Sequence, residues 1–187
     1  MRKLFWGFLL IFLDFNLTLN QHALEVLPDF VGYLVIMKGL EELTPESPLF
    51  EKLRPAALVL AVLSGLQWLG ALLNIHTGGV LLDLALLAGT LYLVWALIAS
   101  LREAETFRGA DLNSAGLQKL WLPMLVLQLS GCALRLLALL SFGLLAVLAI
   151  PLAIAGLVVS VLLLMALWRA AGLYEALPPR DSGVEPH

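Results

Sequence analysis

The sequence predicts an all-α integral membrane protein, a bundle of six transmembrane helices arranged as three hairpins. Of its 187 residues, 61% are hydrophobic and only 13% are charged, whereas about a quarter of an ordinary soluble domain is charged. The mean hydropathy is +0.96. This composition leaves too little polar surface for a soluble globule and is too apolar for a disordered chain. The net charge of −3 excludes the basic surface of a nucleic-acid-binding protein, so no nucleic-acid partner is expected.

Four segments are long and apolar enough to cross a bilayer, which takes roughly 20 residues. They cover residues 55–73, 80–100, 120–140 and 144–168. Two earlier segments, 4–19 and 30–43, are shorter and more polar, and we expect both to be helices that complete the six. Because 30–43 is short, a re-entrant hairpin that does not cross the membrane remains an alternative for it.

The basic residues favour six crossings with both chain ends inside the cell. Cytoplasmic loops carry an excess of Lys and Arg, whereas the predicted outer loops 20–29, 74–79 and 141–143 contain none. With six spans, the following residues all fall inside or at inner helix ends: Arg2, Lys3, Lys38, Lys52, Arg54, Arg102, Arg108, Lys119, Arg169 and Arg180. One transmembrane domain is therefore expected over residues 1–176, with a disordered tail at 177–187.

The inner loops carry helix signals of their own. The loop 44–54 predicts a short interfacial helix that Ser47 caps, with Pro48 in its first position. The loop 101–119 predicts a helical extension followed by a solvated turn. Small residues four positions apart predict close helix packing; these pairs are Ala85 with Gly89, Ala149 with Ala153, and Gly156 with Ser160.

Three ionisable residues lie within predicted spans, where charge is costly and often functional. They are Asp14, Asp83 and Arg135. Each lies about four to six residues, or roughly 6–9 Å, from the outer end of its predicted helix. We therefore expect the three side chains to meet at a common depth, with Asn16 and Gln67 lining the same ligand-binding site.

Three interpretations of this group remain open. Arg135 can pair with Asp83 or Asp14 as a structural ion pair that fixes the register of the helices. Alternatively, Arg135 pairs with one carboxylate while the other faces a water-filled pocket open to the outside. Two acids against one arginine favour a cationic or polar neutral ligand over an anion. The third interpretation is a proton relay through Asp14 or Asp83.

Motifs for enzymatic chemistry are missing from the sequence. There is no G-x-S-x-G, no H-E-x-x-H, no P-loop and no dinucleotide-binding fingerprint. His22 and His76 lie on predicted outer loops without the spacing of metal ligands. The single cysteine, Cys132, is expected to be a packing residue within a span. The sequence therefore predicts no cofactor, no metal and no catalytic residue.

The first third of the chain carries a pattern made of LDFN (13–16), LPDFVGYL (27–34) and KGLEEL (38–43). This pattern resembles an uncharacterised family of small polytopic membrane proteins from Gram-positive-type bacteria. The resemblance implies a bacterial membrane protein but no particular reaction. The residues themselves predict a helix start docked on the first helix, because Gly32 leaves room for a close neighbour. Tyr33 is expected to hold its hydroxyl near the membrane interface.

Three functional hypotheses follow for a multi-pass protein of the cell membrane. The first is a solute-binding or transport-related protein with an outward-facing polar pocket; length and helix number are similar to the substrate-capturing subunits of energy-coupling-factor vitamin transporters. The second is a non-catalytic structural or regulatory protein that binds another membrane subunit or a second copy of itself. The third is a membrane enzyme acting on lipid, although an enzyme is the less expected outcome. The lipid bilayer is a partner in all three.

Overall fold

The computed structural model describes residues 1–12, 16–19, 22–25, 28–73, 79–138 and 145–178; at 16–19, 22–25, 135–138 and 145–148 it describes the backbone alone. The described chain forms six helices and two short strands. In chain order they are α1 (Arg2–Phe12), β1 (Asn16–Leu19), β2 (His22–Glu25), α2 (Asp29–Leu43), α3 (Pro48–Leu72), α4 (Val80–Arg108), α5 (Ser114–Ala138) and α6 (Leu145–Glu175).

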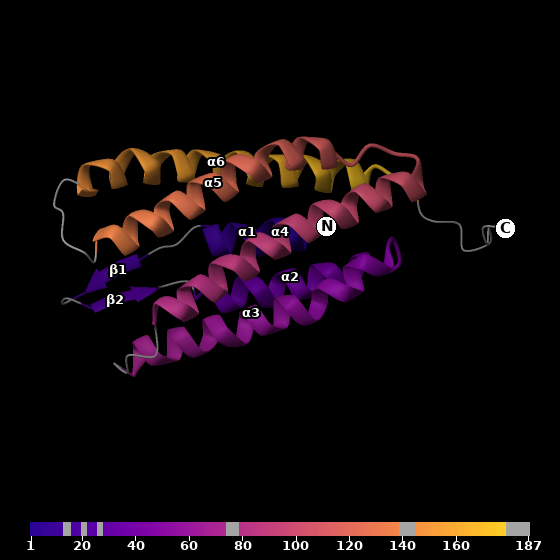
Figure 1. Cartoon of the computed structure of the whole chain (residues 1–187). Helices are drawn as coiled ribbons and strands as arrows, with labels where there is room; N and C mark the ends of the chain where they lie inside the picture. The colour runs from indigo at the N-terminus through magenta and orange to yellow at the C-terminus, as the bar shows by residue number, and fades with distance from the viewer. Residues whose placement is uncertain (13–15, 20–21, 26–27, 74–78, 139–144, 179–187) are drawn as a thin grey trace.

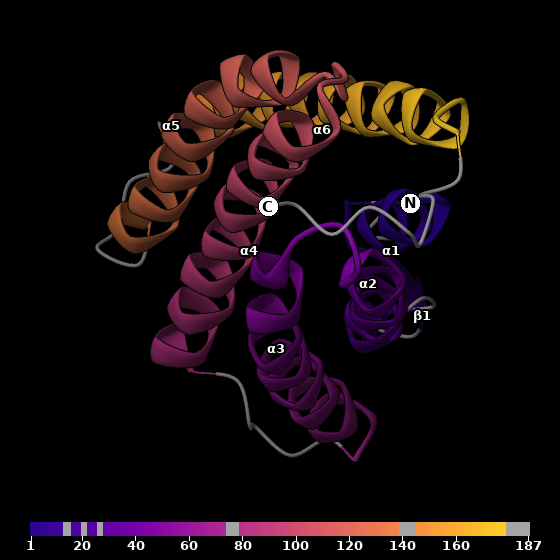
Figure 2. The same cartoon turned by 90° about the vertical axis from the view of Figure 1, so that its right-hand side faces the viewer.

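Each helix packs against the next one in the chain, and α1 packs against α6 (Figures 1 and 2). The start of α1 meets the end of α6, where Arg2 Nη2 lies 2.7 Å from Glu175 Oε2. We call this the termini end of the bundle. The opposite end, where β1 and β2 lie, is the hairpin end (Figure 1). The helical fold class is thus confirmed, with one small sheet added.

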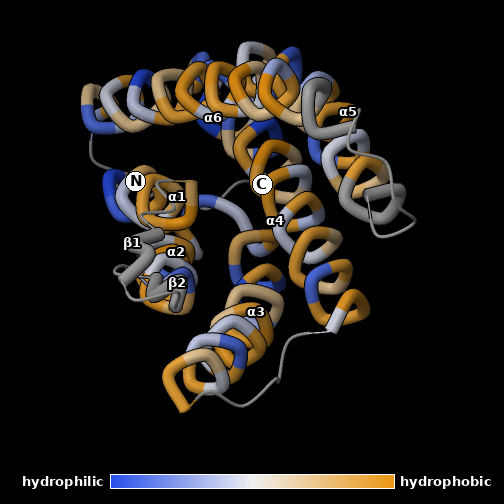
Figure 3. Tube along the Cα trace, turned by 90° about the vertical axis from the view of Figure 1, so that its left-hand side faces the viewer, coloured by the Kyte–Doolittle hydropathy of each residue, from blue (hydrophilic) through white to orange (hydrophobic). Residues whose placement is uncertain are grey.

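Four of the described helices, α3 to α6, are long and apolar enough to cross a membrane. Hydrophobic residues predominate along all four (Figure 3). In contrast, α1 has 11 residues and α2 has 15, which gives lengths of about 16 and 22 Å against a hydrocarbon core of about 30 Å. The chain therefore fits an integral membrane protein, while six spans with both termini inside remain a prediction.

The predicted helix over 4–19 is wrong in its second half. Helix α1 ends at Phe12, and β1 pairs in antiparallel register with β2, Asn16 opposite Glu25 and Leu19 opposite His22. The physical reason is the alternation of polar and apolar residues in this segment, a period of two that suits a strand. The predicted outer loop 20–29 is likewise partly replaced by β2.

Close contact between α1 and α2 depends on glycines. A Cβ added to Gly7 would lie 2.5 Å from Ile36 Cγ1 and 2.8 Å from the Gly32 carbonyl oxygen, and one added to Gly32 would lie 2.7 Å from Ile11 Cγ1. The backbones can approach this closely only because neither residue has a side chain. The prediction that Gly32 accommodates the first helix is confirmed.

Helix α3 begins at the predicted cap, but it is longer than predicted. Ser47 is the N-cap and accepts a hydrogen bond from the Leu49 amide at 3.1 Å, and Pro48 is the first helical residue. The separate interfacial helix over 44–54 is wrong, because α3 runs without a break through Pro55. Pro55 is the eighth residue of α3, so it removes the backbone hydrogen bond to the Glu51 carbonyl, and the helix continues beyond it.

The apolar core is concentrated towards the termini end. All buried residues of α4 lie between Leu91 and Ala104, and those in the described part of α6 begin at Leu163. A small apolar cavity of about 10 Å³ lies beside this core, lined by Phe8, Val94, Leu97, Ile98, Leu117, Leu163 and Leu167. That volume is about one water molecule, too small for a ligand. The hairpin-end halves of α4 and α6 bury no described residue.

Candidate functional site

Two of the five predicted site residues lie together in the described structure. Gln67 of α3 donates from Nε2 to Asp83 Oδ1 of α4 at 2.9 Å. Asp14 lies outside the described residues, as does the side chain of Arg135, whose backbone belongs to α5. Asn16 is part of β1, again with its backbone alone described. The predicted meeting of one arginine with two acids therefore remains a prediction.

Asp83 lies in the first turn of α4, near the hairpin end. The backbone amides of a first helical turn have no partner within the helix, so the Asp83 carboxylate lies beside the positive end of the helix dipole. The side chain is exposed, and its hydrogen bond to Gln67 occupies Oδ1. The pair thus presents a carboxylate oxygen and an amide group that can accept from, and donate to, a polar or cationic ligand.

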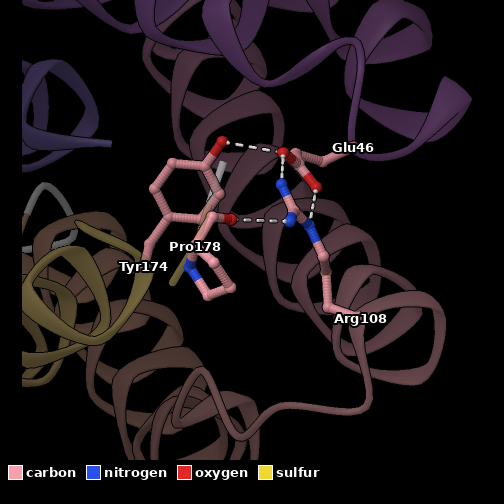
Figure 4. A network of polar contacts seen from close by, with 4 residues as sticks. All are labelled: Glu46, Arg108, Tyr174 and Pro178. Atoms are coloured by element: carbon pink, nitrogen blue, oxygen red, sulfur yellow. Dashed lines mark hydrogen bonds and ion pairs between the residues drawn. The ribbon is translucent and has the colours of Figure 1, made fainter. Parts of the chain in front are cut away.

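A larger polar network lies at the termini end, around the last turns of α4 (Figure 4). Arg108 binds Glu46 through two parallel hydrogen bonds, from Nε to Oε2 at 2.6 Å and from Nη2 to Oε1 at 2.5 Å. The Tyr174 hydroxyl of α6 donates to the same Glu46 Oε1 at 3.0 Å. The side chains of Arg108 and Glu46 are only 18% and 8% exposed. This pair joins the α2–α3 connection to α4 and α6.

Arg108 also holds the segment that follows α6. Its Nη1 donates to the Pro178 carbonyl oxygen at 3.2 Å, so one guanidinium binds two segments at once (Figure 4). Leu177 is partly buried against the core. The remainder of the predicted tail, from residue 179 on, lies outside the described residues.

Two further carboxylates of α4 fasten the helices beside it. Glu105 accepts hydrogen bonds from the amides of Leu112 and Ser114, at 2.8 and 2.9 Å, and from the Ser114 hydroxyl. These contacts satisfy amides at the N-terminus of α5, which have no partner within the helix. Glu103 accepts from the Ser47 hydroxyl at the start of α3. We call this set the polar hub: Glu46, Ser47, Glu103, Glu105, Arg108, Ser114 and Tyr174.

Sequence reasoning missed the polar hub. The segment 101–119 does form the predicted helical extension and turn, but its description as solvated is wrong at Glu105 and Arg108, which make buried or half-buried contacts. Glu46 and Tyr174 are 128 residues apart in the chain. No sequence spacing between Glu46 and Tyr174 predicts that they meet, so only the packing of the helices could reveal their contact.

Tyr33 also differs from its prediction. Its side chain is 2% exposed, and its hydroxyl lies 2.6 Å from Thr90 Oγ1 of α4. Thr90 in turn donates to the Leu86 carbonyl oxygen at 2.7 Å, so Tyr33 is the donor to Thr90. A phenol must hydrogen bond when it is buried, and here it links α2 to α4 within the bundle, while its depth relative to the membrane interface stays a prediction.

No group of three or more His, Cys, Asp or Glu side chains that could hold a metal ion occurs among the residues the structure describes. The chain matches no protein-family model, and no curated protein and no solved structure matches it either. The candidate site must therefore be judged by its own geometry: an exposed amide–carboxylate pair at the hairpin end, and a closed polar hub at the termini end.

Proposed function

We propose that this protein is a multi-pass protein of the cell membrane that binds a small polar or cationic solute in the hairpin-end half of its bundle. The observation that carries the proposal is the contrast between the two ends. A packed core and the polar hub occupy the termini end, whereas the described hairpin-end halves of α4 and α6 contribute no buried residue. The Gln67–Asp83 pair lies in that less tightly packed half and supplies polar groups for recognition.

Access of water to this pair tests the proposal. In a Cys132→Ser background, Asp83→Cys and Gln67→Cys are made and treated, in sealed vesicles, with a charged thiol reagent that cannot cross membranes. We expect both cysteines to react from one side of the membrane. Ile154→Cys serves as the control, because residue 154 is 59% exposed and in this proposal faces lipid, where a charged reagent does not react. Equal, slow labelling at Asp83→Cys and Ile154→Cys would refute the pocket.

The charge of the ligand is tested with a matched pair of probes. Choline and its neutral isostere 3,3-dimethyl-1-butanol are compared for their effect on the thermal midpoint of the purified full chain. We expect choline alone to raise the midpoint, because binding to the folded state stabilises it, and Asp83→Asn to abolish the increase. If the two probes act alike, the ligand is not recognised by its charge.

A second candidate, a protein that binds another membrane subunit, is favoured by one feature of α6. Apart from the adjoining residues and backbone of α6 itself, no described heavy atom lies within 4 Å of the place where a Cβ on Gly156 would stand. Gly156 and Ser160 are small residues four apart, a spacing that lets helices associate closely. The test compares the purified protein with its Gly156→Leu variant, both with Cys132 unchanged. If a stoichiometric membrane partner copurifies with the first and is lost from the second, this function is supported over solute binding.

A further inference from the structure

We propose that the termini end of the bundle binds the headgroups of anionic phospholipids through a ring of five cations. These residues, which we call the basic belt, are Lys38, Lys52, Arg102, Lys119 and Arg169, one on each helix from α2 to α6. The basic belt lies at the opposite end of the helices from Asp83, so this inference does not depend on the proposed solute site.

The structure divides the cations of the termini end into two classes. Four of them have a carboxylate partner: Arg2 with Glu175, Lys3 with Glu42, Arg54 with Glu41, and Arg108 with Glu46. The five residues of the basic belt are exposed and have no carboxylate within 4.0 Å among the described residues. The acids Glu103 and Glu105 instead accept hydrogen bonds from serines of the polar hub. The belt is therefore left to an anion from outside the chain.

Each belt residue continues the exposed apolar stripe of its own helix. On α6, Arg169 follows Met165, Leu162, Val158 and Ile154, which are spaced three or four residues apart and exposed. Lys52 stands in the same relation to exposed residues of α3, which are Val59, Val62, Leu66 and Leu69. Lys119 likewise lies on the same face of α5 as the exposed residues Leu122, Val126 and Leu129. In a membrane such stripes face the lipid chains, because residues three and four apart share one helix face.

On α4 the stripe carries aromatic residues beneath its cation. Trp95 lies seven residues before Arg102, which places both on one face about 10 Å apart along the axis. The rings of Trp95 and Tyr92 are 6.2 Å apart, and both side chains are about half exposed. Aromatic rings of this kind favour the headgroup region of the bilayer. Arg102 would then stand at the level of the lipid phosphates.

The five cations lie at similar offsets from the ends of their helices. Each lies four to six residues from the end of its helix at the termini end, which corresponds to about 6–9 Å along the helix axis. Cations at similar offsets on neighbouring helices can together reach the phosphates of one leaflet. Basic residues at this position attract anionic lipids, and each cation near the surface favours an anionic over a neutral headgroup by up to about fivefold.

The test measures which lipid surrounds the protein. The full chain is reconstituted in vesicles that contain brominated phosphatidylglycerol or brominated phosphatidylcholine, and quenching of tryptophan fluorescence reports the relative binding of the two lipids. We expect a several-fold preference for phosphatidylglycerol that weakens as salt is raised, because salt screens exposed charge.

Two matched triple variants decide whether the basic belt is responsible. One is Lys52→Gln/Arg102→Gln/Arg169→Gln, and the other is Arg2→Gln/Lys3→Gln/Arg54→Gln; each removes one lysine and two arginines. Circular dichroism checks that both retain their helices. We expect the preference to fall towards unity only in the first variant. A preference that survives in the first variant, or an equal loss in both, would overturn the proposal.

Discussion

The two halves of the long helices are built from similar apolar residues but are packed differently. In α4, residues 80–90 include no buried residue, whereas the stretch from Leu91 to Ala104 supplies all of the buried positions of this helix. In α6, Ile154 is 59% exposed and Leu163 is fully buried. Hydropathy alone does not account for this difference, since leucine, isoleucine, valine and alanine are abundant in both halves.

The difference follows the polar contacts. Glu103 and Glu105 of α4 accept hydrogen bonds at the starts of α3 and α5. Arg108 binds Glu46, which also accepts a hydrogen bond from Tyr174 of α6. In lipid, apolar side chains have no strong preference for one another over the lipid chains, so packing and interhelical hydrogen bonds decide which helices associate. The termini end has these charged fixed points, whereas the described polar links nearer the hairpin end are the hydrogen bonds of Gln67 with Asp83 and of Tyr33 with Thr90, neither of which is an ion pair. This comparison leads to three predictions about stability.

The largest effect is expected at the polar hub. Arg108→Ala removes the cation that compensates the charge of the buried Glu46 side chain, and it should cost about 3–5 kcal/mol of unfolding free energy, the range for breaking a buried ion pair. Unfolding in mixed micelles of dodecyl maltoside and dodecyl sulfate measures this. Lys3→Ala removes an ion pair whose side chains are about half exposed, so it should cost no more than about 1 kcal/mol. Similar losses for both variants would contradict the polar hub as the main fixed point.

The next effect compares buried and exposed positions of one helix. Leu163→Ala opens a cavity in the core of the termini end and should cost about 3 kcal/mol, which is typical of a buried leucine. Ile154→Ala, in the exposed half of α6, should change the unfolding free energy by less than about 1 kcal/mol. If Ile154→Ala is as destabilising as Leu163→Ala, an interaction absent from the single chain covers the hairpin-end half of α6.

The smallest effect concerns two glycines. Gly7→Ala forces a methyl group against Ile36 and the Gly32 carbonyl oxygen, and it should destabilise by about 1–3 kcal/mol through overpacking. Gly156→Ala meets no described atom within 4 Å, so it should be neutral or stabilise by up to about 1 kcal/mol through its higher helix propensity. Thermal midpoints in detergent compare the two. A destabilising Gly156→Ala would indicate that a helix from another chain packs on this position.

The sequence predicted features that arise from residues close together in the chain. Ser47 and Pro48 mark the start of α3 because a cap and its helix are adjacent. Gly32 indicated a close helix neighbour for a similar local reason, because glycine has no side chain to hold the neighbour away. The strand β1 was also readable from the alternation of polar and apolar residues in Asn16–Leu19, but the apolar run before it led to the prediction of a longer helix.

The candidate site was less predictable. Of the predicted set, Gln67 and Asp83 lie in contact, 16 residues apart and on consecutive helices. The polar hub was not predicted at all, because Glu46, Arg108 and Tyr174 belong to three separate segments and each has ordinary local surroundings. Their meeting depends on how α4 and α6 cross, which no pattern within either helix specifies.

The sequence by itself determined that the chain suits a membrane, that four of its helices are long enough to span it and that the described cations gather towards one end, because hydropathy and charge are sums over neighbouring residues. Tertiary structure alone decided which cations meet carboxylates and which remain in the basic belt, and which half of the bundle is packed. Those outcomes depend on distances of a few ångströms between helices, since hydrogen bonds and ion pairs act only at that range.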